Sequence, residues 1–156
     1  MTRSPAGREL GYLLLQAGRL VQTAVEDAAA DAGMPSTDLL ALYVLGQHEG
    51  LTGSALARLL SVQQSSITPL ADRLEKAGLI ERERDGQDRR RIWLCPTAEG
   101  RTVITQATSV AREALGAPFA PLSTGSAAAL AALLDEVVEP WLEELAGSRV
   151  ANRDES

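Results

Sequence analysis

A short run of hydrogen-bonding side chains is the part of the sequence best suited to contact a partner. Five such residues lie close together: Gln63, Gln64, Ser65, Ser66 and Thr68. Short polar side chains at the start of a helix let the backbone approach the edges of nucleic-acid bases. Glutamine can pair with adenine through two hydrogen bonds, and serine or threonine can bind phosphates or several bases. The run therefore indicates either contact with DNA or an ordinary solvated helix start.

Arginines form the second candidate group. Arg89, Arg90 and Arg91 follow Asp88, and Arg73 lies further along the helix that the polar run begins. A guanidinium is planar and can bind a phosphate or a guanine through two hydrogen bonds. The arginines favour a nucleic-acid contact, with a solvated charge run as the alternative. Arg91 has the weaker case, because alternation along a strand can direct its side chain to the other face.

Enzymatic chemistry has little support in the residue set. The sequence holds one histidine, His48, and one cysteine, Cys95, far apart along the chain. It contains no metal-ligand spacing, no glycine-rich phosphate loop and no paired catalytic carboxylate motif. We therefore expect no enzyme activity, no metal and no cofactor. For Cys95 a partly buried structural thiol is favoured over a redox role, and the sequence leaves that choice open.

Charge is distributed unevenly along the 156 residues, whose formal net charge is −6. Residues 1–57 have a net charge of −3 and residues 102–156 a net charge of −5. Residues 58–101 have 9 basic and 7 acidic side chains, which gives +2. This middle third includes both candidate groups. An acidic chain can therefore still offer a cationic region to DNA.

Composition also limits the class of protein. Hydrophobic residues make up 45% of the chain, which is too many for a disordered protein, and a single cysteine excludes a disulfide scaffold. No apolar run approaches the ~18 residues of a membrane span. The run Leu13–Leu15 is too short for a secretory signal. We therefore expect a soluble, cytoplasmic protein of one domain, or of one domain with appendages, and no membrane partner.

The elements that position the candidate groups follow from periodicity. Apolar residues at steps of three and four predict a series of helices: one between Pro5 and Gly33, one between Ser36 or Thr37 and Gly50, a short one that Thr52 caps, and one from Gln64 to Ala77. The last two, joined by a tight turn, are typical of a helix-turn-helix. Two strands, Leu79–Arg84 and Arg91–Leu94, then flank an Asp85-Gly86 turn signal. A hairpin in this place is a wing, so the predicted fold class is mainly α with a small β-wing (α+β).

Two further long helices are predicted, one that Thr97 caps and one from about Ser123 to Ala146. We expect the last helix to bury its apolar side chains: Leu130, Leu133, Leu134, Val137, Val138, Trp141, Leu142 and Leu145. Together with the first helix, these faces exceed what a helix-turn-helix of roughly 60 residues can cover. A second copy packed by twofold symmetry would cover them, which predicts a homodimer. Residues 1–35 and 97–156 would then form the dimerisation region, and residues 36–96 the DNA-binding lobe.

The combined pattern resembles the MarR family of winged helix-turn-helix transcription regulators. The resemblance rests on four stretches: Leu56 to Thr68, Asp72 to Arg82, Asp88-Arg89-Arg90, and Thr97-x-x-Gly100. It implies a homodimer that binds a pseudo-palindromic operator in double-stranded DNA, commonly with release by an oxidant or by a small ligand, aromatic or other. It also implies that Arg90, the second arginine of the Asp-x-Arg motif, enters the minor groove. Asp88 is expected to orient the arginines through charge-assisted pairing.

The sequence departs from the family pattern in three places. Gln63-Gln64 replaces the frequent Ser-Pro, which predicts a weaker helix cap, and Pro69 stands where many relatives have an arginine. Pro96 replaces the leucine that usually precedes the threonine at Thr97. We expect a sequence-specific DNA-binding regulator, and a repressor in preference to an activator. The alternative is a dimeric protein-interaction module of the same fold that has lost DNA binding. The sequence does not identify the operator, the target genes or an effector.

Overall fold

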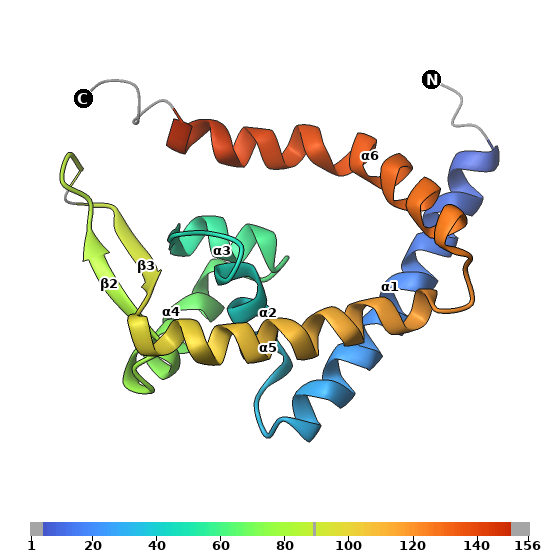
Figure 1. The fold of residues 1–156 in the computed structure, drawn as a ribbon. Helices are drawn as coiled ribbons and strands as arrows, with labels where there is room; N and C mark the ends of the chain where they lie inside the picture. Colours follow the sequence, from blue (N-terminus) through green and yellow to red (C-terminus); the bar gives the residue numbers. More distant parts are fainter. Residues whose placement is uncertain (1–4, 89, 151–156) are drawn as a thin grey trace. The chain divides into compact units, whose positions relative to one another are not determined.

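The structure is a computed structural model that describes residues 5–88 and 90–150 (Figure 1). Its elements, in chain order, are α1 (Pro5–Asp31), α2 (Ser36–Leu45), β1 (Leu51–Thr52), α3 (Gly53–Leu59), α4 (Gln64–Lys76), β2 (Ile80–Arg84), β3 (Ile92–Pro96), α5 (Ala98–Gly116), the 3-10 turn η1 (Ala117–Phe119) and α6 (Thr124–Val150). This confirms the predicted fold class, which is mainly helical with a small β-wing. Among the described residues, no single helix is both long and apolar enough to cross a membrane.

The chain divides into two compact units after Pro118. The first unit holds α1 to α5 and the sheet, and the second holds α6. This division follows compactness alone. The functional division into a DNA-binding lobe, residues 36–96, and a flanking dimerisation region therefore stays a prediction.

Helix α2 lies at the centre of the first unit, where it contacts α1, α3, α4 and α5. Its sequence is apolar on nearly every side, and a helix of this kind is stable only when other elements surround it. Leu39, Leu42 and Leu45 of α2 are fully buried, as are Leu56 of α3 and Ile80 of β2. The helix-turn-helix and the wing are thus built onto one continuous apolar core.

The sheet has the strand order β1-β3-β2, and both pairings are antiparallel. Ile80 lies opposite Pro96 and Arg84 opposite Ile92, so β3 extends two residues beyond the predicted Leu94. Pro96 is accommodated at the end of this strand, where the ladder stops. Strand β1 was not predicted, because two residues are too few to show a period.

Two predicted helix caps are confirmed, and one is wrong. The hydroxyls of Thr52 and Thr97 accept the backbone N–H groups three residues later, at 3.2 and 2.8 Å. In α2, however, Pro35 is the N-cap residue and no side chain caps the helix. The carbonyl of Pro35 instead accepts the N–H groups of the first turn. The predicted end at Gly50 is also wrong, because hydrogen bonds of the tighter three-residue type stop the helix after Leu45.

The apolar face of α6, which the sequence predicts to pack against a second copy of the chain, is exposed at several positions in the single chain. Leu133 is 60% exposed and Val137 is 73% exposed, because α6 forms a unit of its own. The side chains of Trp141, Leu142 and Leu145 lie outside the described residues. Helix α1 also has exposed leucines, among them Leu13 at 56%. Both long helices therefore have exposed apolar side chains among the described residues.

Candidate nucleic-acid interface

Helix α4 buries one face and leaves its polar start exposed. Ile67, Leu70, Ala71 and Leu74 are buried against the core. The side chains of the predicted polar run are all exposed: Gln63, Gln64, Ser65, Ser66 and Thr68. Gln63 is the N-cap residue but makes no side-chain hydrogen bond to the helix, which confirms the weaker cap. The helix is thus fixed through one side, and its first two turns are accessible to a partner.

Arg73, in the last part of α4, is bound to a carboxylate of α2. Its Nε donates to Oδ2 of Asp38 at 3.1 Å, and one terminal nitrogen donates to Oδ1 at 2.6 Å. The Asp38 side chain is 9% exposed, whereas that of Arg73 is 50% exposed. The hydrogen bond to Asp38 raises the pKa of Arg73 above its ordinary value. A contact of Arg73 with DNA stays a prediction, and the remaining N–H groups of the half-exposed guanidinium could make it.

Arg82 joins the wing to α4. From β2 its guanidinium pairs with Asp72 at 2.6 Å and also with Glu75, both on α4. The hydrogen bond that Arg82 donates to Asp72 raises the pKa of the guanidinium above its ordinary value. Because two carboxylates hold one arginine, the base of the wing has a fixed place beside α4.

The wing loop carries Asp88 and Arg90, and both are exposed. Oδ1 of Asp88 accepts the backbone N–H of Arg90 at 3.0 Å. This contact is local, because an aspartate readily binds the main chain two residues away. The expected charge-assisted pairing of Asp88 with the arginine side chains stays a prediction. Arg89 lies outside the described residues.

A tight junction connects the wing to α5. The Thr97 hydroxyl donates to the Gly78 carbonyl at 2.6 Å, and the Thr97 N–H donates to the Leu79 carbonyl at 3.1 Å. A Cβ atom on Gly100 would lie 1.9 Å from the Leu79 carbonyl oxygen. Gly78 itself has a positive φ of 74° and ends α4, as predicted. The glycines of this region are therefore required by the backbone.

Sequence reasoning missed Asp38 and the wing residue Asp85. Asp38 is the buried charged residue of the described core, and its one sequence signal is an acid within an otherwise apolar helix. Asp85 was noted only as part of a turn signal, yet its carboxylate accepts three hydrogen bonds. Cys95 is partly buried, as expected, whereas its redox chemistry stays untested.

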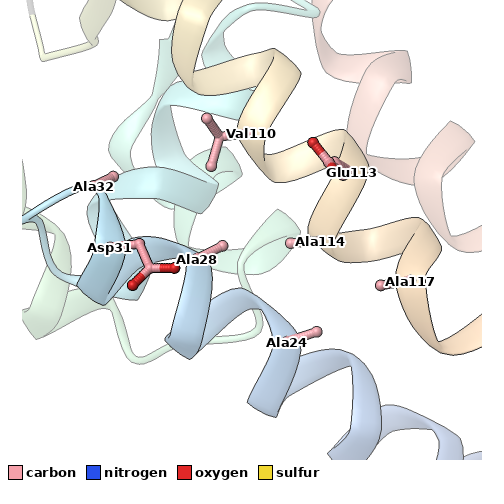
Figure 2. Close-up of a pocket in the computed structure, with 8 residues that line it drawn as sticks. All are labelled: Ala24, Ala28, Asp31, Ala32, Val110, Glu113, Ala114 and Ala117. Carbon is pink, nitrogen blue, oxygen red and sulfur yellow. The ribbon is translucent and has the colours of Figure 1, made fainter.

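A groove of about 480 Å³ lies between α1 and α5 (Figure 2). Alanines of both helices line it, with Val110. Asp31 of α1 and Glu113 of α5 add two carboxylates (Figure 2). The groove has the size of a small-ligand site, and its carboxylates favour a neutral or cationic occupant.

Comparison with known proteins places the chain in a family. The sequence profile of the MarR family matches residues 34–92. The HTH-type transcriptional repressor Rv2887 of Mycobacterium tuberculosis is 31% identical over 105 residues, which are 67% of this chain and 76% of that protein. The regulator YcgE of Bacillus subtilis is 41% identical over 70 residues, and the chain spans only 46% of its length. These relatives are transcriptional regulators and not enzymes.

Solved structures have the same architecture. A MarR family regulator from Rhodococcus sp. RHA1 has a TM-score of 0.72 and 26% identity, over 89% of this chain and 98% of that one. The M. tuberculosis protein Rv2887, in complex with p-aminosalicylic acid, has a TM-score of 0.69 and 27% identity, over 82% and 97%. A variant of Escherichia coli MarR with operator DNA shares the fold at 21% identity and a TM-score of 0.66, over 83% and 94%. This chain is therefore a member of the MarR family.

Proposed function

We propose that the protein is a sequence-specific DNA-binding transcriptional repressor that acts as a homodimer in the cytoplasm. The observation that carries the proposal is the division of α4 into a buried apolar face and an exposed polar start. A recognition helix needs this division, because one side must hold it in the lobe while the other enters the major groove. The relatives named as repressors support the same reading.

In the proposed complex, the paired α4 helices enter successive major grooves about 34–36 Å apart. Gln63, Gln64, Ser65, Ser66 and Thr68 contact bases and phosphates, with Arg73 at a phosphate or guanine. The wing approaches the minor groove through Arg90, with Arg89 beside it, and Asp88 holds the loop around Arg90. The twofold symmetry of the dimer matches a pseudo-palindromic operator.

A gel mobility-shift experiment against the upstream region of the protein's own gene tests this function. Counterion release makes the affinity of a DNA-binding protein fall steeply as salt rises. We therefore expect a specific shift at low salt that weakens at a second, higher salt concentration. An unrelated duplex of equal length is the control for sequence specificity. If no duplex binds at low salt, the chain is instead a dimeric interaction module of this fold.

We also propose that a small molecule releases the operator, since one relative of known structure is in complex with p-aminosalicylic acid. In this chain the groove between α1 and α5 is a candidate site. An effector that prefers a dimer with the wrong separation of its lobes would weaken operator binding. Because Asp31 and Glu113 line the groove, we expect neutral or cationic aromatic compounds to bind it better than carboxylic acids.

A further inference from the structure

One carboxylate, that of Asp85, organises the loop between β2 and β3. Its Oδ1 accepts the backbone N–H of Gln87 at 2.8 Å and that of Asp88 at 3.1 Å. Its Oδ2 accepts the indole N–H of Trp93 at 3.0 Å. One side chain thus satisfies two donors of the loop and one donor of the following strand.

Main-chain hydrogen bonds close the same loop. The Asp85 N–H donates to the Arg91 carbonyl at 3.1 Å, and the Arg91 N–H donates to the Asp88 carbonyl at 2.8 Å. Arg90, whose N–H is bound by the Asp88 side chain, lies within this closed segment and is exposed. The backbone that carries Arg90 is therefore held on both sides by contacts within the chain.

Trp93 connects the loop to the helix-turn-helix. It lies opposite Glu83 of β2 and Thr52 of β1. Thr52 is also the residue that caps α3. The Asp85 carboxylate consequently links the wing loop to a strand whose other neighbour leads directly into α3.

The electrostatics of the loop agree with this arrangement. The hydrogen bonds from Gln87, Asp88 and Trp93 lower the pKa of Asp85, the first of them most, and the nearby charge of Arg91 adds to the effect. The surroundings therefore favour the ionised carboxylate, which is the form that accepts all three bonds.

We propose that Asp85 is a positioning residue for DNA binding, which acts by holding the wing loop in the conformation that presents Arg90 to the duplex. This inference rests on the proposed function. A loop that already has its bound conformation loses less conformational entropy when it meets DNA. Asp85 would thus strengthen binding although its charge has the same sign as the phosphates.

The direction of the change in DNA affinity when the Asp85 charge is removed distinguishes the positioning role from simple repulsion of the phosphates. If Asp85 were only a solvated acid, removing its charge would strengthen binding, as it would for any acid near DNA. Glu83, exposed on β2 of the same wing, is the matched control. Glu83→Gln and Asp85→Asn remove the same charge from the same hairpin, and Asp85→Ala also removes every acceptor atom.

The affinity of these variants for the operator duplex is measured by fluorescence anisotropy at one salt concentration. We expect Glu83→Gln to bind as tightly as the unchanged protein or tighter. Asp85→Ala should bind about tenfold more weakly. Asp85→Asn should lie between these two, because an amide oxygen can keep part of the turn. Tighter binding by all three variants would overturn the proposal.

A spectroscopic readout tests the contact without DNA. The chain has two tryptophans, so a 1H–15N spectrum shows two indole N–H resonances, and Trp93→Phe identifies the one from Trp93. We expect this resonance to move further in Asp85→Ala, which loses the acceptor of the indole N–H, than in Glu83→Gln, which keeps that acceptor. If the resonance moves in Asp85→Ala but neither the unchanged protein nor any variant binds DNA, the proposed function is wrong and the contact between Asp85 and Trp93 is confirmed. If the unchanged protein binds DNA and Asp85→Ala binds it equally well, only the positioning role fails.

Discussion

Three arginines of α4 and the wing lie in three different environments. Arg73 is bound to a buried carboxylate, Arg82 lies between two carboxylates of α4, and Arg90 is exposed in the wing loop. A guanidinium that already has carboxylate partners has fewer donors left for a phosphate. Of these three, Arg90 is therefore the one whose charge we expect DNA to use most fully.

Replacing Arg90 tests this expectation. Arg90→Ala should cost about 1–3 kcal/mol of operator binding, because a groove contact is lost. The dimer should persist, since the wing loop is far along the chain from both long terminal helices. The measurement is an operator titration together with the molar mass in solution. Arg112→Ala, which removes an equal charge from an exposed site on α5, is the control. Equal affinity for Arg90→Ala and the unchanged protein would remove the wing from the mechanism.

Removing Arg73 and removing the charge of Asp38 are expected to lower the free energy of unfolding by different amounts. Arg73→Ala leaves the Asp38 carboxylate buried without its partner and should lower the free energy of unfolding by about 1–3 kcal/mol. Asp38→Asn leaves a half-exposed guanidinium that water can solvate, so the loss should be smaller. Urea unfolding of the two variants measures both values. A larger loss for Asp38→Asn would contradict the burial argument.

Among the elements, the sequence predicts the helix faces, caps and turns that have local signals. It does not predict features that depend on contacts between residues far apart in the chain. The apolar face of α4, the caps at Thr52 and Thr97 and the left-handed Gly78 all have local signals, and the structure confirms them. Asp38, the partner of Arg73, lies 35 residues away in α2, so no local spacing in the sequence predicts this contact. Strand β1 forms only because β3 offers it a partner.

The junction between α5 and the wing can be tested at Gly100. Gly100→Ala should lower the free energy of unfolding by about 1–3 kcal/mol or more. The reason is that the new Cβ would overlap the main chain of Leu79. Gly116→Ala, at the other end of α5, meets no atom within 4 Å and should be neutral or slightly stabilising. Thermal unfolding of both variants is the measurement, and equal stability would argue against the close approach.

The wing loop should keep its conformation at acidic pH for as long as Asp85 stays ionised. A carboxylate whose pKa is lowered in the folded protein stabilises the folded conformation at pH values above its ordinary pKa of 3.8. This stabilisation is lost as the pH falls through the lowered pKa. We therefore expect the Trp93 indole resonance to titrate with a midpoint below 3.8. In Asp85→Asn this titration should be missing. A midpoint at or above the ordinary value would mean that the loop donors do not bind the carboxylate in solution.

Each of the two units exposes large apolar side chains among the described residues. Leu10, Leu13 and Leu20 of α1 are each more than half exposed, as are Leu133 and Val137 of α6. Exposed apolar side chains that gather on one surface are typical of a protein–protein interface. A second copy of the chain, as proposed above, would bury them.

The molar mass in solution tests this assembly. Light scattering should give twice the 16.5 kDa of the chain. Leu13→Asp should shift the population toward single chains or unfolded protein, because a buried carboxylate without a partner is costly. Thr23→Asp, at a polar exposed position of the same helix, should leave the mass unchanged. A single-chain mass for the unchanged protein would exclude the proposed operator geometry.

The hydroxyl of Thr97 has a consequence for how such a regulator can be controlled. It begins α5 by accepting the Gly100 N–H, and it also holds the carbonyl of Gly78, just beyond the last turn of α4. One atom therefore belongs to the ends of two helices. If a bound molecule rotated or shifted α5, the Thr97 hydroxyl would pass that movement directly to the end of α4. Control of DNA binding through α5 would then need no other connecting element.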